Sequence, residues 1–141
     1  QGPLRGMKVV LANGCFDPCH IGHLWHLLQA REMGDKLIES VTEDAGVRAE
    51  KGEKRPVFPQ EQRAQFIGQF RCVDGVIVVR DSFDALQRVK PAVFVKGSEY
   101  RKRISDRDAE FCKTHGIEIR FTDGPVYSST LFLKYYEPRR R

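Results

Sequence analysis

The amino-acid sequence predicts an α/β fold of three layers, with a central parallel sheet and helices on both faces. Short apolar runs, such as Val9-Val10-Leu11-Ala12 and Val76-Ile77-Val78-Val79, alternate along the chain with longer segments of helical periodicity. This alternation is typical of parallel strands joined by right-handed helical crossovers. With 141 residues and no linker or internal repeat, the chain is expected to form one domain.

The strands follow from the apolar runs, and the helices from the periodic segments between them. We expect strands over residues 8–12, 36–42, 76–79, 92–96 and 117–121, and helices over 21–33, 60–70, 83–89 and 105–115. A further helix is expected to open at Ser128 or Ser129. Residues 43–58 form a charged, glycine-containing connection with room for one short helix.

Punctuating residues support the expected boundaries. Gly34 and Gly116 are glycine stops after the first helix and after the helix over 105–115. Pro59 suits a helix N-terminus. Ser82 is an expected N-cap, and Ser105 or Asp106 caps the helix that follows.

The stretch from Asn13 to His23, which reads NGCFDPCHIGH, joins the first strand to the first helix. It places His20 and His23 where that helix begins. Free backbone N–H groups and the helix dipole at this position favour bound anions. Imidazoles can donate hydrogen bonds to oxygens that gain charge in a transition state. These residue types therefore indicate phosphate chemistry.

Residues 14–23, which read Gly-x-Phe-Asp-x-x-His-x-Gly-His, resemble the signature of the cytidylyltransferase-like nucleotidyltransferases. The segment Lys96-Gly97-Ser98-Glu99-Tyr100 is similar to an element of the heptose-phosphate adenylyltransferase domain. Residues 127–130 resemble the Ser/Thr-rich entry to the family's last helix, and residues 55–63 resemble the segment with an acceptor-binding arginine. Together the motifs span residues 8 to about 135.

The resemblance implies a Rossmann-like fold and nucleotidyl transfer, in which an acceptor phosphate oxygen attacks the α-phosphorus of a nucleoside triphosphate and pyrophosphate leaves. The implied catalytic residues are His20, His23 and a loop lysine, Lys51 or Lys54. The implied nucleotide-binding residues are Gly14, Cys15, Phe16, Gly22, Lys96, Gly97, Tyr127, Ser128, Ser129 and Thr130. The implied acceptor-binding residues are Asp17, Arg63 and Glu99.

Three points about this site stay open at the level of the sequence. Asp17 is expected either to hold the turn through backbone N–H groups or to touch the acceptor. Mg²⁺ is expected on the triphosphate, held by phosphate oxygens and water rather than by protein ligands. A homodimer is one arrangement that the resemblance suggests.

For the substrates, the sequence favours CTP and a small phosphate or phosphonate acceptor, because the chain is compact and lacks a sugar-sized insertion. The family members considered include glycerol-phosphate cytidylyltransferases and the cytidylyltransferase domain of fosfomycin-type phosphonate biosynthesis. Phe121 replaces an arginine of the glycerol-phosphate enzymes, and Glu99 replaces a commoner aspartate. The first alternative is therefore ATP with a sugar 1-phosphate such as heptose phosphate. The second is a non-catalytic nucleotide-binding module.

The net charge of +5 owes three charges to residues 139–141. A local cluster of Arg48, Lys51, Lys54 and Arg55 is expected to clamp a triphosphate, although a solvated loop would have the same composition. Because no aromatic residues are interleaved with these cations, we expect no nucleic-acid partner.

Four cysteines do not amount to a disulfide framework, so reduced thiols and a cytoplasmic location are expected. Cys15, Cys19, His20 and His23 raise the hypothesis of a zinc-binding interaction domain. Their spacing matches no standard finger, so we expect no protein metal site and interpret the two thiols as packing residues beside a phosphate site.

The expected domain covers residues 4–136, between an expected remnant of an engineered protease site at 1–3 and a basic tail at 137–141. No apolar run is long enough to span a bilayer and no signal peptide is visible, so no membrane partner is expected. A second expectation is that the chain is one domain of a longer protein.

Overall fold

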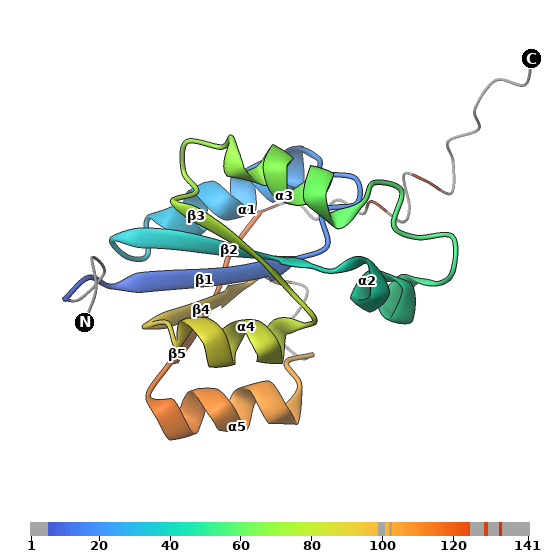
Figure 1. The fold of residues 1–141 in the computed structure, drawn as a ribbon. Helices are drawn as coiled ribbons and strands as arrows, with labels where there is room; N and C mark the ends of the chain where they lie inside the picture. The colour runs from blue at the N-terminus through green and yellow to red at the C-terminus, as the bar shows by residue number, and fades with distance from the viewer. Residues whose placement is uncertain (1–5, 99–100, 102, 125–128, 130–132, 134–141) are drawn as a thin grey trace, which may run out of the picture.

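Five parallel strands form one sheet in a computed structural model that describes residues 6–98, 101, 103–124, 129 and 133 (Figure 1). The strands are β1 (Val9–Gly14), β2 (Lys36–Thr42), β3 (Gly75–Val79), β4 (Val93–Lys96) and β5 (Glu118–Phe121). The helices are α1 (Ile21–Arg31), α2 (Asp44–Lys51), α3 (Gln60–Gly68), α4 (Ser82–Val89) and α5 (Asp106–His115). The predicted α/β class and the Rossmann-like arrangement are confirmed.

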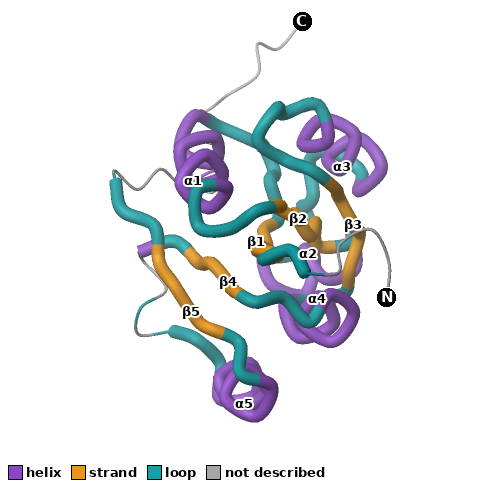
Figure 2. The backbone as a smooth tube through the Cα atoms, turned by 90° about the vertical axis from the view of Figure 1, so that its left-hand side faces the viewer, coloured by secondary structure: helices purple, strands orange, loops and turns teal. Residues whose placement is uncertain are grey.

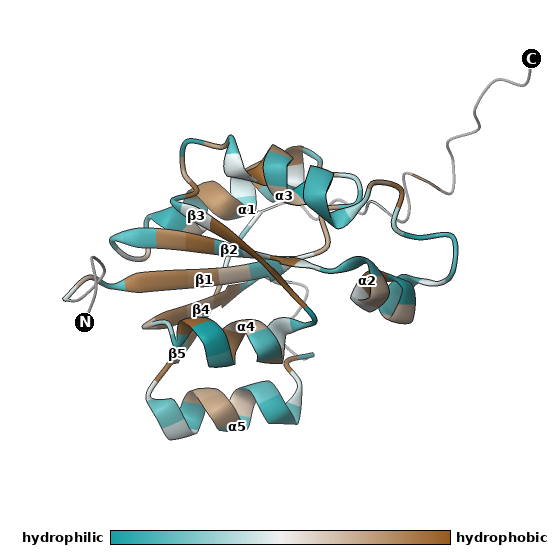
Figure 3. Ribbon diagram, viewed as in Figure 1, coloured by the Kyte–Doolittle hydropathy of each residue, from teal (hydrophilic) through white to brown (hydrophobic). Residues whose placement is uncertain are grey.

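The sheet is covered on both faces, as the alternation of strands and helices predicts. Leu27 of α1 and Ile67 of α3 pack on one face, and Leu86 of α4 and Cys112 of α5 pack on the other. Figure 2 shows the two pairs of helices on opposite sides of the strands. The strands themselves are mostly apolar in Figure 3, as expected of strands that are buried between two layers.

The strand order is β3-β2-β1-β4-β5. After β1 the chain adds β2 and β3 on one side of it, and then crosses back to add β4 and β5 on the other side. Leu11 lies opposite Ile38 of β2 on one side and opposite Phe94 of β4 on the other. In open parallel sheets a ligand crevice forms beyond the carboxyl ends of the strands at such a reversal. The reversal lies at the end of β1, directly before His20 and His23.

The helix boundaries differ from the sequence-based ones by a few residues at most. The short helix for which residues 43–58 left room is α2. The predicted N-cap of α4 is wrong by one residue: Asp81 caps the helix, and its Oδ1 accepts from the amide of Asp84 at 2.8 Å. Ser105 caps α5, as predicted. Ser129 and Leu133 are helical, while residues 1–5 and 134–141, including both predicted terminal segments, lie outside the described residues.

Glu39, in the middle of β2, is a buried residue that the apolar pattern does not anticipate. Its side chain is 0% exposed, and neither carboxylate oxygen has a hydrogen-bond partner. Leu37 and Val41, which share its face of the strand, belong to the core beneath α1 and α3. Burial raises the pKa of Glu39 well above its usual value, which favours the neutral form of the carboxyl group.

Candidate active site

A cavity of about 780 Å³ lies at the carboxyl edge of the sheet, within the volume range of small-molecule sites. Its wall combines the β1–α1 loop, the ends of β2 and β4, helix α2 and the segment after β5. The predicted site residues that line it are Gly14, Cys15, Phe16, Asp17, His20, Gly22, His23, Lys51, Lys96, Gly97 and Ser129. Residues as far apart in the chain as Gly14 and Ser129 are therefore brought together, as the motifs predict.

His20 and His23 are fixed by the backbone at the start of α1. Nδ1 of His20 accepts from the amide of Gly22 at 3.1 Å, and Nδ1 of His23 accepts from the amide of His20 at 3.0 Å. A ring nitrogen that accepts from an N–H group carries no proton of its own. Each neutral imidazole therefore has its proton on Nε2, and the pair presents two N–H donors at a helix N-terminus.

The two imidazoles are also packed so that their orientation is defined. Their rings stack with centroids 3.9 Å apart and an angle of 20° between the planes. Burial, followed by the neighbouring His20, His26 and Lys51 side chains, lowers the pKa of His23 to about 3. His23 is therefore neutral at physiological pH and acts as a hydrogen-bond donor without carrying a charge.

Phe16 supports this arrangement from the turn before α1. Its backbone has a φ of +52°, and its ring meets the ring of His23 edge-on at 4.8 Å. A Cβ at Gly14 would lie 2.9 Å from the Phe16 ring, closer than side chains approach one another. Gly14 therefore leaves room for the ring that packs on His23, a role for both residues that is distinct from the nucleotide contact expected from the sequence.

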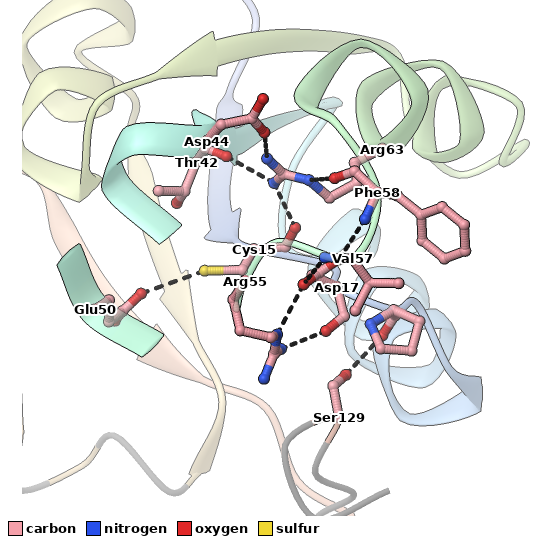
Figure 4. A network of polar contacts seen from close by, with 11 residues as sticks. Cys15, Asp17, Thr42, Asp44, Glu50, Arg55, Val57, Phe58, Arg63 and Ser129 are labelled. Carbon is pink, nitrogen blue, oxygen red and sulfur yellow. Dashed lines mark hydrogen bonds and ion pairs between the residues drawn. The ribbon is translucent and has the colours of Figure 1, made fainter. Parts of the chain in front are cut away.

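Asp17 and Arg55 form a buried ion pair on the cavity wall, with 1% and 8% of their surfaces exposed (Figure 4). Arg55 Nε donates to Asp17 Oδ2 at 2.8 Å, and its Nη2 donates to the Asp17 carbonyl oxygen. The amides of Val57 and Phe58 also donate to the Asp17 carboxylate, at 2.8 and 3.0 Å. Burial alone raises the pKa of Asp17, but these hydrogen bonds outweigh it and the net pKa is lowered.

The structure gives Asp17 a contact that neither expectation names. Its carboxylate accepts from backbone amides, but these belong to Val57 and Phe58, some 40 residues away, and not to its own turn. It thereby brings the guanidinium of Arg55 to the cavity that the histidines line.

The structure gives Arg63 a different role from the acceptor contact that we expect from the sequence. Arg63 is 3% exposed and does not belong to the cavity lining. Its guanidinium donates to the carbonyl oxygens of Phe58, Cys15 and Thr42 at 2.9, 2.8 and 2.7 Å, and to Asp44 Oδ1 at 2.7 Å (Figure 4). These acceptors hold Arg63 inside the protein, where it ties four chain segments together.

Helix α2 forms the wall opposite the histidines. Lys51, at its end, lines the cavity, whereas Lys54 is exposed and lies outside the lining. The structure thus favours Lys51 over Lys54 as the loop lysine. Cys15 Sγ donates to Glu50 Oε2 at 3.3 Å, and burial together with that carboxylate raises the pKa of Cys15 to about 11. Cys15 is accordingly a neutral thiol in the wall rather than a nucleophile.

The ends of β4 and β5 form the remaining wall. Lys96 ends β4, and burial lowers its pKa below the usual value. Thr122, Asp123 and Gly124 follow β5 and line the cavity beside it. Ser129 Oγ donates to the carbonyl oxygen of Pro18 at 2.6 Å. The predicted site residues Glu99, Tyr127, Ser128 and Thr130 lie outside the described residues.

The zinc hypothesis for Cys15, Cys19, His20 and His23 has no geometric support. Both Nδ1 atoms already accept from backbone amides, and the Cys15 thiol meets Glu50. In the part of the chain that the structure describes, no three His, Cys, Asp or Glu side chains are grouped to hold a metal ion.

Two features of the site were not singled out from the sequence. His26 lines the cavity, with Nδ1 2.8 Å from Thr122 Oγ1, and burial followed by the charge of Lys96 lowers its pKa to about 4. Its place three residues after His23, on the same face of α1, is the signal that could have identified it. The cavity also extends over Arg80, Asp81 and Ser82 at the start of α4, which no local motif marks.

Comparisons with known proteins agree with this geometry. A family model described as cytidylyltransferase-like matches residues 11–132. The chain is 42% identical over 98 residues to the bifunctional protein HldE of Geobacter sulfurreducens, covering 68% of this chain and 20% of that protein. It is 44% identical over 101 residues to HldE of Proteus mirabilis, covering 69% and 21%. The chain therefore spans about a fifth of the length of these relatives.

Among solved structures, the fold is similar to a lipopolysaccharide core biosynthesis protein from Thermoplasma volcanium. The TM-score is 0.72 at 26% identity, over 86% of this chain and 100% of that one. In the described residues, no helix combines the length and the apolar character that crossing a membrane requires.

Proposed function

The chain belongs to the cytidylyltransferase-like family, and on that premise we propose that it is an adenylyltransferase acting on a sugar 1-phosphate such as heptose phosphate. An acceptor phosphate oxygen attacks the α-phosphorus of ATP and forms a new P–O bond. The bond from the α-phosphorus to the bridging oxygen breaks, and pyrophosphate leaves. The protein supplies alignment and stabilisation of charge rather than a covalent nucleophile.

The observation that carries the proposal is the pair of neutral imidazoles whose Nδ1 atoms are both occupied by backbone amides. Simple phosphate binding needs only backbone amides and cations such as Lys51, and no paired imidazoles. Two Nε2–H donors held in a partly buried site are suited to oxygens that gain charge during the reaction. Removal of one such donor is expected to lower turnover by roughly 100-fold or more.

The acceptor phosphate is assigned to Arg55. Unlike Arg63, Arg55 lines the cavity, and Asp17 fixes the direction of its guanidinium. A guanidinium binds phosphate oxygens in a defined planar geometry. The nucleoside is assigned to the other end of the cavity, beside Lys96, Gly97 and the segment after β5.

ATP replaces CTP, which the sequence favours, as the proposed donor. The support comes from the HldE relatives, and from the likeness of Lys96-Gly97-Ser98 to the heptose-phosphate adenylyltransferase domain. A sugar phosphate as acceptor agrees with the polar lining of the cavity, in which Asn13, Thr42 and Glu50 offer partners for hydroxyl groups.

Magnesium would accompany the nucleotide and neutralise charge on its phosphates. The carboxylate of Asp17 is committed to Arg55 and two backbone amides. The ion would consequently be held by phosphate oxygens and water, with Lys51 as the neighbouring protein cation. Catalysis by the chain's own residues then consists of holding both reactants and donating hydrogen bonds.

A pyrophosphate-release assay tests the proposal, with ATP or CTP, magnesium, and heptose 1-phosphate, glycerol phosphate or a small phosphonate. We expect release with ATP and heptose 1-phosphate at least ten times faster than with any CTP combination. A preference for CTP overturns the choice of donor. If no mixture releases pyrophosphate but calorimetry detects nucleotide binding, the chain is a non-catalytic binding module.

Two substitutions of His23 make the test specific to the donor. His23→Asn keeps an acceptor near the position of Nδ1 for the His20 amide but has no group near Nε2. His23→Gln reaches the position of Nε2 with an N–H donor. We expect the asparagine variant to lose roughly 100-fold in kcat and the glutamine variant to lose less. Equal losses in both variants would argue against the Nε2–H role.

A further inference from the structure

The second and third turns of α1 hold the segment that follows β5. Gln29 Nε2 donates to the carbonyl oxygen of Asp123 at 2.6 Å, and the amide of Asp123 donates back to Gln29 Oε1 at 2.9 Å. One turn earlier, His26 Nδ1 lies 2.8 Å from Thr122 Oγ1. We refer to these three hydrogen bonds as the α1 clasp.

The clasp supplies hydrogen bonds to the residues just after β5, on the side of this edge strand that faces away from β4. A glutamine side chain carries one amide oxygen and one NH₂ group, so it can pair with both backbone groups of one residue, as a neighbouring strand would. On the other side, the amide of Thr122 donates to the Lys96 carbonyl oxygen at 3.0 Å. The segment 122–124 is thereby held between β4 and α1, although it belongs to no strand itself.

This segment is part of the cavity wall, whereas Gln29 is not. Thr122, Asp123 and Gly124 all line the cavity, and Gln29 lies behind them outside the lining. Gly124 has a φ of +126°, a conformation that favours glycine. Gln29 thus supports the wall through Asp123 without lining the cavity itself.

Helix α1 consequently connects two parts of the site. Its N-terminal end carries His20 and His23, which line the cavity, and its third turn carries Gln29, which bonds to the wall beside Lys96 and Gly97. A helix of 11 residues with buried Leu27 and Ala30 is a stiff connection between the two. The distance between the phosphate donors and that wall is therefore set within one rigid element.

We propose that Gln29 is a positioning residue for the nucleoside, which it serves by holding residues 122–124 at a fixed distance from the paired histidines. The inference rests on the proposed function for its assignment of the nucleoside to this end of the cavity. A displacement of about 1 Å in such a wall weakens the contacts of a bound base or ribose. The acceptor end, at Arg55 and Asp17, belongs to other segments and is unaffected.

The test compares Gln29→Glu with Gln65→Glu. The first variant keeps the size of the side chain and the acceptor for the Asp123 amide. It replaces the NH₂ donor by a carboxylate oxygen that meets the Asp123 carbonyl oxygen at the 2.6 Å contact. The second makes the same charge change on α3, at an exposed position outside the cavity lining. ATP affinity is measured by calorimetry, and kcat and the KM values of ATP and the acceptor by pyrophosphate release.

We expect Gln29→Glu to raise the Kd and KM of ATP by about 3- to 10-fold, while kcat, the acceptor KM and the unfolding midpoint stay near those of Gln65→Glu. Wild-type-like ATP affinity in Gln29→Glu overturns the inference, as does an equal rise in the acceptor KM. A weakened ATP affinity without pyrophosphate release in the wild-type chain supports the clasp and overturns only the proposed reaction. Absence of ATP binding by the wild-type chain overturns both.

Discussion

The Asp17 carboxylate and the Arg55 guanidinium meet at 2.8 Å with almost no exposure to solvent, 38 positions apart in the chain. The pair joins the loop before α1 to the segment before α3. It is the contact through which the histidine loop and the proposed acceptor end of the cavity become parts of one site.

Substitution Asp17→Asn leaves Arg55 buried without its charged partner. We expect the free energy of unfolding to fall by about 3 kcal/mol at neutral pH, since breaking one side of a buried pair is costly. The acceptor KM should rise more than the ATP KM because residues 55–58 lose their anchor. Urea unfolding and steady-state kinetics measure these effects, with the exposed Glu110→Gln as the matched loss of one negative charge.

The same variant has a pH signature. Because the folded-state pKa of Asp17 lies below the unfolded value of 3.8, its contribution to stability is present above that value and is lost as the pH falls through the folded pKa. The stability difference between wild type and Asp17→Asn should therefore shrink below pH 3.8. A difference that stays constant at acid pH would show that the carboxylate charge is not its source.

Substitution Gly14→Ala should act on His23 through Phe16. The added Cβ would come within 2.9 Å of the Phe16 ring, which has to turn away from His23. We expect kcat to fall by about 10- to 100-fold, as for other small displacements of catalytic groups. Gly68→Ala is the control, because its Cβ would meet only a Val76 methyl group at 3.7 Å. Equal kcat values in the two variants would show that the packing of Phe16 on His23 does not affect catalysis.

The protonation state of His23 can be followed directly by NMR. With a pKa of about 3, its ring resonances should stay constant from pH 8 to pH 5, and those of His26, with a pKa of about 4, should change only near the lower limit. A free imidazole in a model peptide, which titrates near pH 6.5, provides the reference in a parallel sample. A midpoint above pH 6 for His23 would mean that the ring is charged in the cavity and that Nδ1 does not accept from the backbone.

The buried Glu39 should make the free energy of unfolding fall as the pH rises, whereas Asp17 makes it fall as the pH drops. Its folded-state pKa is raised above the unfolded value of 4.5, so the stabilisation by the neutral form is complete below 4.5 and is lost as the pH rises through the folded pKa. Glu39→Leu should remove this slope and raise the free energy of unfolding at pH 8 by about 1–3 kcal/mol, because two unsatisfied buried oxygens disappear. Chemical unfolding from pH 5 to pH 8 measures both, and an unchanged slope in Glu39→Leu would contradict the assignment.

The parts of this protein that local sequence determines were predictable. The strand and helix order follows from apolar runs and their punctuation, and the position of His20 and His23 at a helix start follows from the glycine turn before it. The crevice at β1 then follows from the parallel topology, since carboxyl ends of strands meet at one edge of the sheet.

What the sequence could not provide were the partners of long polar side chains. Arg55 and Arg63 lie in one charged segment, and the residues around them in the sequence do not indicate which of the two is buried. Yet the acceptors of Arg63 include Cys15 and Thr42, which are 48 and 21 residues away. Such contacts depend on how α3 docks on the sheet, so the sequence could not show that Arg63 is held inside the protein, outside the cavity lining. Glu39 was missed for a related reason: it occupies an inward position between Leu37 and Val41 where the pattern calls for an apolar residue.

The four hydrogen bonds of Arg63 have a consequence for how the protein opens. One guanidinium secures the exit of β1, the exit of β2, the first residue of α2 and the approach to α3. Undocking of α3 would release these segments in a single step, so the rim around the cavity gains or loses order cooperatively and not loop by loop. Hydrogen exchange of the amides in that rim would then share one opening free energy, lower than that of the sheet beneath.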